Sequence, residues 1–209
     1  MGEGVTPDTE WVTAMATIEP TDTERTVLPG RPPFTVDDLL NFPDDGNRYE
    51  LFNGSLLVSP SPTPLHQLMI TNLLIILQSA APPHLVTLTT VNLRATDKDY
   101  YIPDLVVVPR EIGRSMNLML APQDILLTVE VGSPSTKMRD EQLKAEVYAR
   151  AGIPVYLRIE PDEGPALYVY ELGDEDADEY GPPTVYKAGT VANLTMPFPV
   201  SFDPGQLAE

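Results

Sequence analysis

The sequence predicts an α/β protein in which a mixed β-sheet is flanked by α-helices. The chain has 209 residues, of which 42% are apolar, and this is enough for one domain with a substantial core. Short β-branched segments typical of strands alternate with longer segments that carry helix-capping signals. Their order is helix, hairpin, helix, three strands, helix and strand, which is typical of a mixed sheet with helices packed beside it.

The N-terminal part combines a polar segment with a helix and a hairpin. Residues 1–33 are rich in Thr, Pro, Gly and Glu, and we expect a flexible arm before a single domain at 34–209. A short helix follows, because Thr35 and Asp38 have the spacing of a helix-capping pair. The Asn-Gly pair at 53–54 lies between two alternating segments and predicts a type I′ hairpin turn.

The central part predicts two long helices and a series of strands. Segment 63–81 is long, apolar on most faces and starts with Thr-Pro, so we expect a central, largely buried helix. Segments 84–95 and 98–111 are each expected to form one strand, and the Leu-Val-Val-Val run in the second indicates burial on both faces. A helix is expected at 135–152, because it has Ser-Thr at its start and ends before Gly152, and it puts Tyr148 in the core. The remaining expected elements are strands at 124–134, 153–161, 166–172, 183–189 and 196–202.

Composition excludes several classes of function. The formal net charge is −18, whereas a protein that coats nucleic acid non-specifically is normally basic. The absence of cysteine excludes disulfides and thiolate nucleophiles, and with two histidines it also argues against a zinc enzyme. No apolar run is long enough to span a membrane and no secretory signal is recognisable, so we expect a cytoplasmic protein.

Three acidic residues lie where strand propensity favours apolar ones. Glu50 is in YELF, Asp104 precedes LVVVP and Glu130 is in LTVEV. Burying an unpaired carboxylate is unfavourable by several kcal/mol, but a Mg²⁺ or Mn²⁺ ion reverses this balance because it prefers oxygen ligands. Such an ion lowers the pKa of a bound water and stabilises the charge of a phosphodiester transition state. Lys144, on the next helix, is a candidate to lie near the attacking water.

Each of these residues, taken singly, has an ordinary structural interpretation. Asp104 fits a Pro-Asp turn, Glu130 fits an edge strand and Glu50 fits the polar face of a hairpin. Lys144 fits an ion pair with Asp140 on one helix face. The metal site is favoured by the set: an acid after Pro, an acid within the next strand, and a lysine on the following helix.

Three stretches of the chain resemble the Uma-two family of endonucleases in the PD-(D/E)XK nuclease superfamily. They read YELFNGSLLVSPSPTPLHQ, IPDLVVVP and LTVEVGSPSTKMRDEQLKAEVYARAGIPVYLRIEP, and the third is the most specific. The resemblance covers residues 34–205. It implies a restriction-endonuclease-like fold with an N-terminal hairpin. It also implies Mg²⁺- or Mn²⁺-dependent hydrolysis of nucleic acid, with DNA favoured over RNA as the substrate. A homodimer remains open, by analogy with nucleases that cut both strands.

The resemblance also implies roles for individual residues. Asp104 and Glu130 match the two metal-binding acids, and the backbone carbonyl of Val131 matches the usual main-chain ligand. Glu50 matches an additional catalytic acid. The motif lysine usually follows the second acid by two residues, where this chain has glycine, and Lys144 matches a lysine moved to the next helix. His66 matches a family histidine and is a candidate contact with the substrate or with the metal ligands. Lys137, Arg139 and Asp140 are further candidates because of their positions near Glu130 and Lys144 in the sequence.

The chain departs from the family pattern, and two other functions compete with the nuclease. Ser55 replaces an acid in the hairpin and Arg158 enters a strand, changes that concern substrate preference. The negative charge favours an inactive nuclease-fold module for binding or regulation. That alternative weakens if Arg94, Lys98, Lys137, Arg139 and Lys144 lie on one face. A serine hydrolase is disfavoured, because GSPS lacks the G-x-S-x-G elbow.

Overall fold

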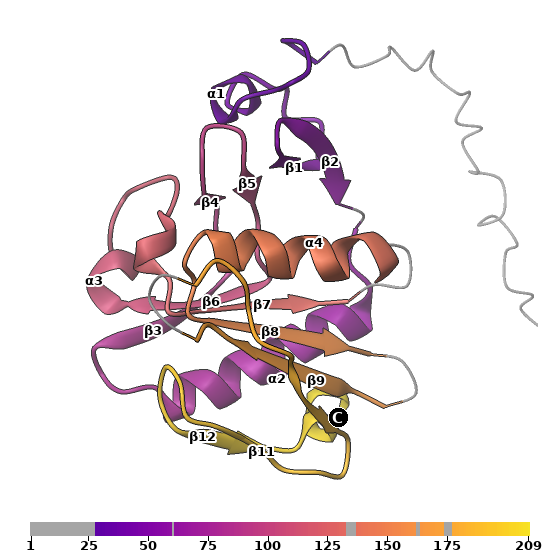
Figure 1. The fold of residues 1–209 in the computed structure, drawn as a ribbon, viewed down its shortest axis with the longest axis vertical. Coiled ribbons are helices and arrows are strands. Elements are labelled where there is room, and N and C mark those ends of the chain that lie inside the picture. Colours follow the sequence, from indigo (N-terminus) through magenta and orange to yellow (C-terminus); the bar gives the residue numbers. More distant parts are fainter. Residues whose placement is uncertain (1–27, 60, 133–136, 162–163, 174–176) are drawn as a thin grey trace, which may run out of the picture.

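A six-stranded mixed sheet forms the centre of the molecule, with one long helix on each face (Figure 1). The structure is a computed structural model and describes residues 28–59, 61–132, 137–161, 164–173 and 177–209, with the side chains of 137–142 left out. The strand order is β10-β9-β8-β7-β6-β3, and only the β7–β8 pair is parallel. The strands are β3 (Leu85–Thr89), β6 (Leu105–Pro109), β7 (Leu127–Val131), β8 (Val155–Glu160), β9 (Ala166–Glu171) and β10 (Thr184–Lys187).

The two faces of this sheet are covered by different helices because side chains alternate along each strand. Helix α2 (Pro64–Ala80) packs on the face that carries Leu105, Val107 and Val129. Helix α4 (Lys137–Arg150) packs on the opposite face, where Val147 and Tyr148 join Val106, Val108 and Tyr156. The Leu-Val-Val-Val run of β6 is therefore buried on both faces, as predicted.

A second, smaller sheet has the order β2-β1-β5-β4 and lies above α4 in the view of Figure 1. The predicted hairpin is confirmed, since Asn53 and Gly54 have φ values of 48° and 74° in the turn. Thr35 and Asp38 form the expected capping box of α1. The elements are α1 (Val36–Leu39), β1 (Arg48–Phe52), β2 (Ser55–Ser59), β4 (Leu93–Arg94) and β5 (Tyr100–Tyr101).

The C-terminal elements pack against α2. The side-chain amide of Asn72 donates to the backbone carbonyls of Gln206, Leu207 and Glu209. This contact holds the end of the chain on the helix, away from α4. The remaining elements are α3 (Arg110–Gly113), η1 (Pro122–Asp124), β11 (Ala192–Leu194), β12 (Val200–Phe202) and η2 (Pro204–Ala208).

Two segments predicted as single strands are each divided between the two sheets. Segment 84–95 becomes β3 and β4, and Thr90 between them has a φ of 55° that interrupts extended backbone. Segment 98–111 becomes β5 and β6, separated by Pro103, which has no N–H to give to a ladder. Both breaks place the chain at the junction of the sheets, and Asp104 lies there.

Two further predictions need correction. Helix α2 is buried on one face only, through Met69, Ile70, Leu73 and Leu77, because the sheet contacts a single face of it. In segment 196–202 only the last residues form a strand, since prolines precede them, and β11 has no predicted counterpart. No helix in the described ranges is long and apolar enough to cross a membrane.

Candidate active site

The four predicted catalytic residues meet at the junction of the two sheets, beside α4. Asp104 immediately precedes β6, Glu130 lies in β7, Glu50 lies in β1 and Lys144 lies on α4. Strand β7 is flanked by β6 and β8, so Glu130 is not on an edge strand. Glu50 and Asp104 are 6% and 8% exposed, which also rejects the hairpin-surface and open-turn interpretations.

Lys144 connects two of the carboxylates. Its Nζ lies 2.6 Å from Oε1 of Glu50 and 3.2 Å from Oε1 of Glu130, and the rings of Tyr101 and Tyr148 flank the ammonium. Burial alone would lower the pKa of Lys144, but the charges of Glu130 and Glu50 outweigh burial and hold it well above its ordinary value. The lysine therefore stays protonated at neutral pH and acts as a cation, not as a base.

Glu50 has both carboxylate oxygens engaged. Oε1 accepts the N–H of Ile102 at 2.9 Å in addition to Lys144, and Oε2 accepts the hydroxyl of Ser59 at 3.0 Å. Burial raises the pKa of Glu50, but Lys144 and these hydrogen bonds lower it further than burial raises it. The carboxylate is therefore ionised, and its contacts fix the position of Lys144.

Glu130 is held through one oxygen only. The hydroxyl of Tyr148 donates to Oε1, the same oxygen that faces Lys144, while Oε2 has no hydrogen bond within the described part of the chain. Burial raises the pKa of Glu130 to about 7, with Lys144 opposing the shift and Asp104 adding to it. A carboxylate with such a pKa is poised to gain from a nearby cation.

Asp104 shows the same division between its two oxygens. Oδ2 accepts the N–H of Val131 at 2.9 Å and lies 3.2 Å from Nε2 of His66. Oδ1 makes no hydrogen bond to a described residue. Burial lowers the pKa of His66, but its hydrogen bond to Asp104 and the charge of that residue raise it above the ordinary value. His66 thus contacts Asp104, one of the two acids predicted to bind the metal.

The donor set fits a hard divalent cation. Glu130 lies in β7 and Asp104 immediately precedes the adjacent strand β6, and each offers one oxygen that has no partner among the described residues. The described residues contain no group of three or more His, Asp or Glu side chains that could hold a metal. Two carboxylates and the Val131 carbonyl, completed by water and phosphate, suit Mg²⁺ or Mn²⁺, which commonly keep several non-protein ligands.

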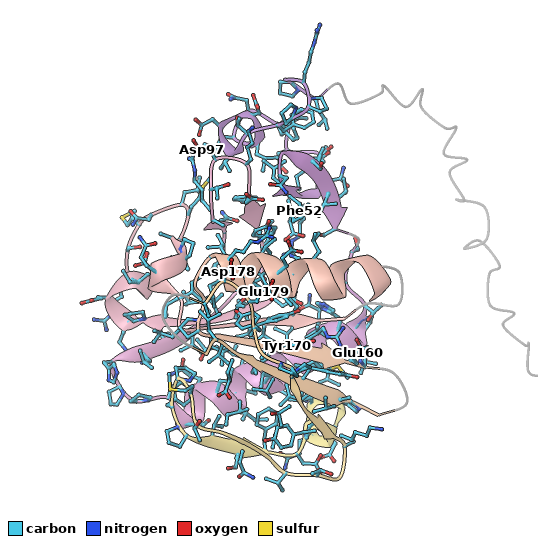
Figure 2. All side chains as sticks on the ribbon, viewed as in Figure 1. Phe52, Asp97, Glu160, Tyr170, Asp178 and Glu179 are labelled. Carbon is cyan, nitrogen blue, oxygen red and sulfur yellow. The ribbon has the colours of Figure 1, made fainter. Side chains whose placement is uncertain are left out.

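Among the residues predicted to make secondary contacts, only His66 has a described side chain. The side chains of Lys137, Arg139 and Asp140 lie outside the described residues. Of the five cations whose clustering on one face would favour the nuclease, Lys144 is buried and Arg94 is paired with Asp37 and Asp97. Asp97 lies at the turn between β4 and β5, away from α4 (Figure 2).

Tyr148 has a role that the sequence does not reveal. It is buried in the core, as expected, yet its hydroxyl also fixes Glu130. The available signal was its position four residues after Lys144, one turn along the same helix face. An apolar environment and a polar tip are compatible in tyrosine, so its sequence context alone does not separate the two roles.

Comparisons with known proteins agree with this architecture. Residues 36–207 match the model of the Uma2 family, described as "Putative restriction endonuclease". A solved structure from Anabaena variabilis ATCC 29413, "a putative nuclease belonging to DUF820", has a TM-score of 0.68 and 19% identity, covering 84% of this chain and 97% of that chain. This likeness confirms the predicted α/β fold. No curated protein matches the chain.

Proposed function

The chain belongs to the Uma2 family, and from this premise we propose that it is a nuclease that hydrolyses phosphodiester bonds of nucleic acid with the help of a divalent cation. One observation carries the proposal. Asp104 and Glu130 each present an oxygen without a partner in the described part of the chain, beside a buried lysine that stays protonated. This is the combination of hard ligands and fixed positive charge that phosphoryl chemistry needs.

The protein prepares these groups before any substrate binds. The N–H of Val131 fixes Asp104, and the hydroxyl of Tyr148 fixes Glu130, so both carboxylates are oriented at no entropic cost during the reaction. Together with the Val131 carbonyl they would hold Mg²⁺ or Mn²⁺. When bound, the ion would neutralise phosphate charge and acidify water.

Lys144 has a different role in the proposed reaction. Its ammonium is held by Glu50 and Glu130, which restrict it to one position. A permanently protonated group cannot accept the proton of the attacking water. It orients that water by donating a hydrogen bond, and it stabilises the negative charge that develops on the phosphate. Glu50 is then a positioning residue that acts through Lys144.

A second candidate function is an inactive nuclease-fold module that binds a partner or regulates it. The net charge of −18 favours this alternative, because non-specific binding to nucleic acid depends on neutralising phosphates. The two functions share the fold and differ in the metal site. Metal binding and cleavage must therefore be measured separately.

The decisive experiment compares cleavage by the wild type and site variants. Supercoiled plasmid, single-stranded DNA and RNA are incubated with Mg²⁺, Mn²⁺ or chelator, using the wild type, Asp104→Asn and Glu130→Gln. The matched control is Glu146→Gln, which removes one exposed acid from α4 that pairs with Arg150. Cleavage that needs metal, is lost in both site variants and persists in the control supports the nuclease.

Metal binding provides the second readout. Calorimetric titration with Mn²⁺ should show binding to the wild type and to Glu146→Gln, and weaker binding to Asp104→Asn. Binding without cleavage of any polymer would favour the inactive module. No binding by the wild type would overturn the proposed metal site.

A further inference from the structure

Arg48 lies beside the candidate site and is not assigned a role by the predicted motif. It starts β1, two residues before Glu50, so both side chains leave the same face of the strand. Its Nη2 donates to the carbonyl of Ile102 at 3.3 Å, while the N–H of Ile102 binds Glu50. The guanidinium therefore lies against the peptide that leads through Pro103 into Asp104.

Arg48 differs from the other described cations near the site in its partners. Lys144 lies between two carboxylates, and Arg158 lies 3.2 Å from Glu160. Arg48 has no carboxylate within ion-pair distance among the described residues, and its Nε is buried without a hydrogen-bond partner. Within the described part of the chain, one hydrogen bond to a carbonyl leaves most of its five N–H donors without a protein partner.

This arrangement is unfavourable unless an acceptor arrives. A half-buried guanidinium loses hydration, and a buried donor without a partner is destabilising. The planar fork of arginine matches two oxygens of a phosphate, which a lysine ammonium does not. In a chain with a net charge of −18, a cation held at the site also supplies the local attraction that a phosphate needs.

We propose that Arg48 binds the non-bridging oxygens of a nucleic-acid backbone phosphate beside the candidate site. This inference rests on the proposed nuclease function and adds a substrate-binding residue to it. The carbonyl of Ile102 holds the guanidinium on the face of β1 from which the Glu50 side chain also leaves. A phosphate bound to Arg48 would therefore lie next to Lys144 and the carboxylate of Glu50.

Binding measured without cleavage tests this residue. Fluorescence anisotropy with short labelled duplex DNA, single-stranded DNA and RNA is recorded in Ca²⁺ over a salt series, for the wild type, Arg48→Gln and Arg48→Lys. The control Arg150→Gln removes an exposed arginine that is paired with Glu146 on α4. Cleavage of the same polymers in Mn²⁺ is measured in parallel.

We expect Arg48→Gln to bind about tenfold more weakly and its salt slope on duplex DNA to fall by about 0.9, the value for one lost phosphate contact. Arg48→Lys should keep the slope and recover only part of the affinity, because it keeps the charge without the fork. Arg150→Gln should bind like the wild type. Thermal unfolding of each variant verifies that the fold is intact. If Arg48→Gln does not fold, Arg48→Lys still tests the proposal, because it keeps the charge and loses only the planar fork.

The possible outcomes separate the two proposals. Equal affinity and slope for Arg48→Gln and the wild type would overturn the role of Arg48, even if both proteins cleave. Weaker binding by Arg48→Gln with no cleavage by the wild type would support Arg48 and contradict the nuclease. A wild type that binds none of the polymers would overturn the assignment of Arg48.

Discussion

Within the described residues, two clusters that each place one cation between two carboxylates differ mainly in burial. In the cluster at the candidate site the cation is 8% exposed, and its carboxylates are 8% and 18% exposed. In the cluster at the tip of the smaller sheet the cation is 35% exposed and its carboxylates 75% and 84%. The members are Lys144 with Glu50 and Glu130, and Arg94 with Asp37 and Asp97.

The comparison shows that similar contacts have different consequences in different surroundings. Water screens the exposed cluster, so each of its pairs contributes little to stability. In the buried cluster, leaving a charge unpaired is strongly destabilising, because water cannot solvate it. The same burial raises the pKa of Glu130 to about 7. Strongly shifted carboxylates and cations are typical of functional sites, and the burial of this cluster is what makes its chemistry available.

The largest expected effect comes from removing the buried cation. Lys144→Met leaves Glu50 and Glu130 side by side without a positive charge, so the free energy of unfolding should fall by about 3 to 5 kcal/mol, and cleavage should be lost. Urea denaturation measures the first effect and plasmid cleavage the second. Arg150→Gln on the same helix is the control, and a loss as small as that of the control would show that the cluster is not buried in solution.

The pH dependence of the metal-free protein sharpens the comparison. The pKa of Glu130 is raised to about 7 by burial, Asp104 and Glu50, against Lys144 and Tyr148. Because the pKa of Glu130 in the folded state lies above the ordinary 4.5, the folded state binds this proton more tightly than the unfolded state. The protonated group therefore adds to the free energy of unfolding, fully below pH 4.5, and this contribution is lost as the pH rises to about 7. The loss is on the order of 3 kcal/mol.

Unfolding in chelator between pH 4 and 8 tests this expectation. Glu130→Gln should show a smaller decrease in the free energy of unfolding over the same window. A residual decrease is expected from His66, whose raised pKa acts in the same direction. Parallel pH curves for the wild type and the variant would show that Glu130 titrates near its ordinary pKa.

A compensating substitution separates stability from catalysis. Adding Glu50→Gln to Lys144→Met removes one of the two unpaired charges, and about 2 kcal/mol of the lost stability should return while cleavage stays absent. The double-mutant cycle in urea gives the coupling between the residues. If the double variant were less stable than Lys144→Met, the contacts of Glu50 with Ser59 and Ile102 would outweigh the destabilising effect of its unpaired charge.

The sequence predicts the elements of this site better than their arrangement. Glu130 and Asp104 can be found because each interrupts a local strand pattern, and the hairpin follows from an Asn-Gly turn. The pair between Glu50 and Lys144 joins residues 94 positions apart, and no local signal specifies it. The breaks that divide two strands between two sheets are likewise set by tertiary packing, which overrides strand propensity.

The smallest expected effect is at the exposed cluster, where Arg94→Ala removes the cation that links β4 to α1 through Asp37 and pairs with Asp97. The decrease in the free energy of unfolding should be several-fold smaller than for Lys144→Met, and it should shrink further in concentrated sodium chloride, because salt screens exposed pairs. Urea denaturation at low and high salt measures both. The effect of Lys144→Met should hardly respond to salt, since its charges are shielded from ions by the protein itself. A salt-independent loss at Arg94 equal to that at Lys144 would mean that burial does not distinguish the clusters, and the pKa of Glu130 would then need a cause other than its position beneath α4.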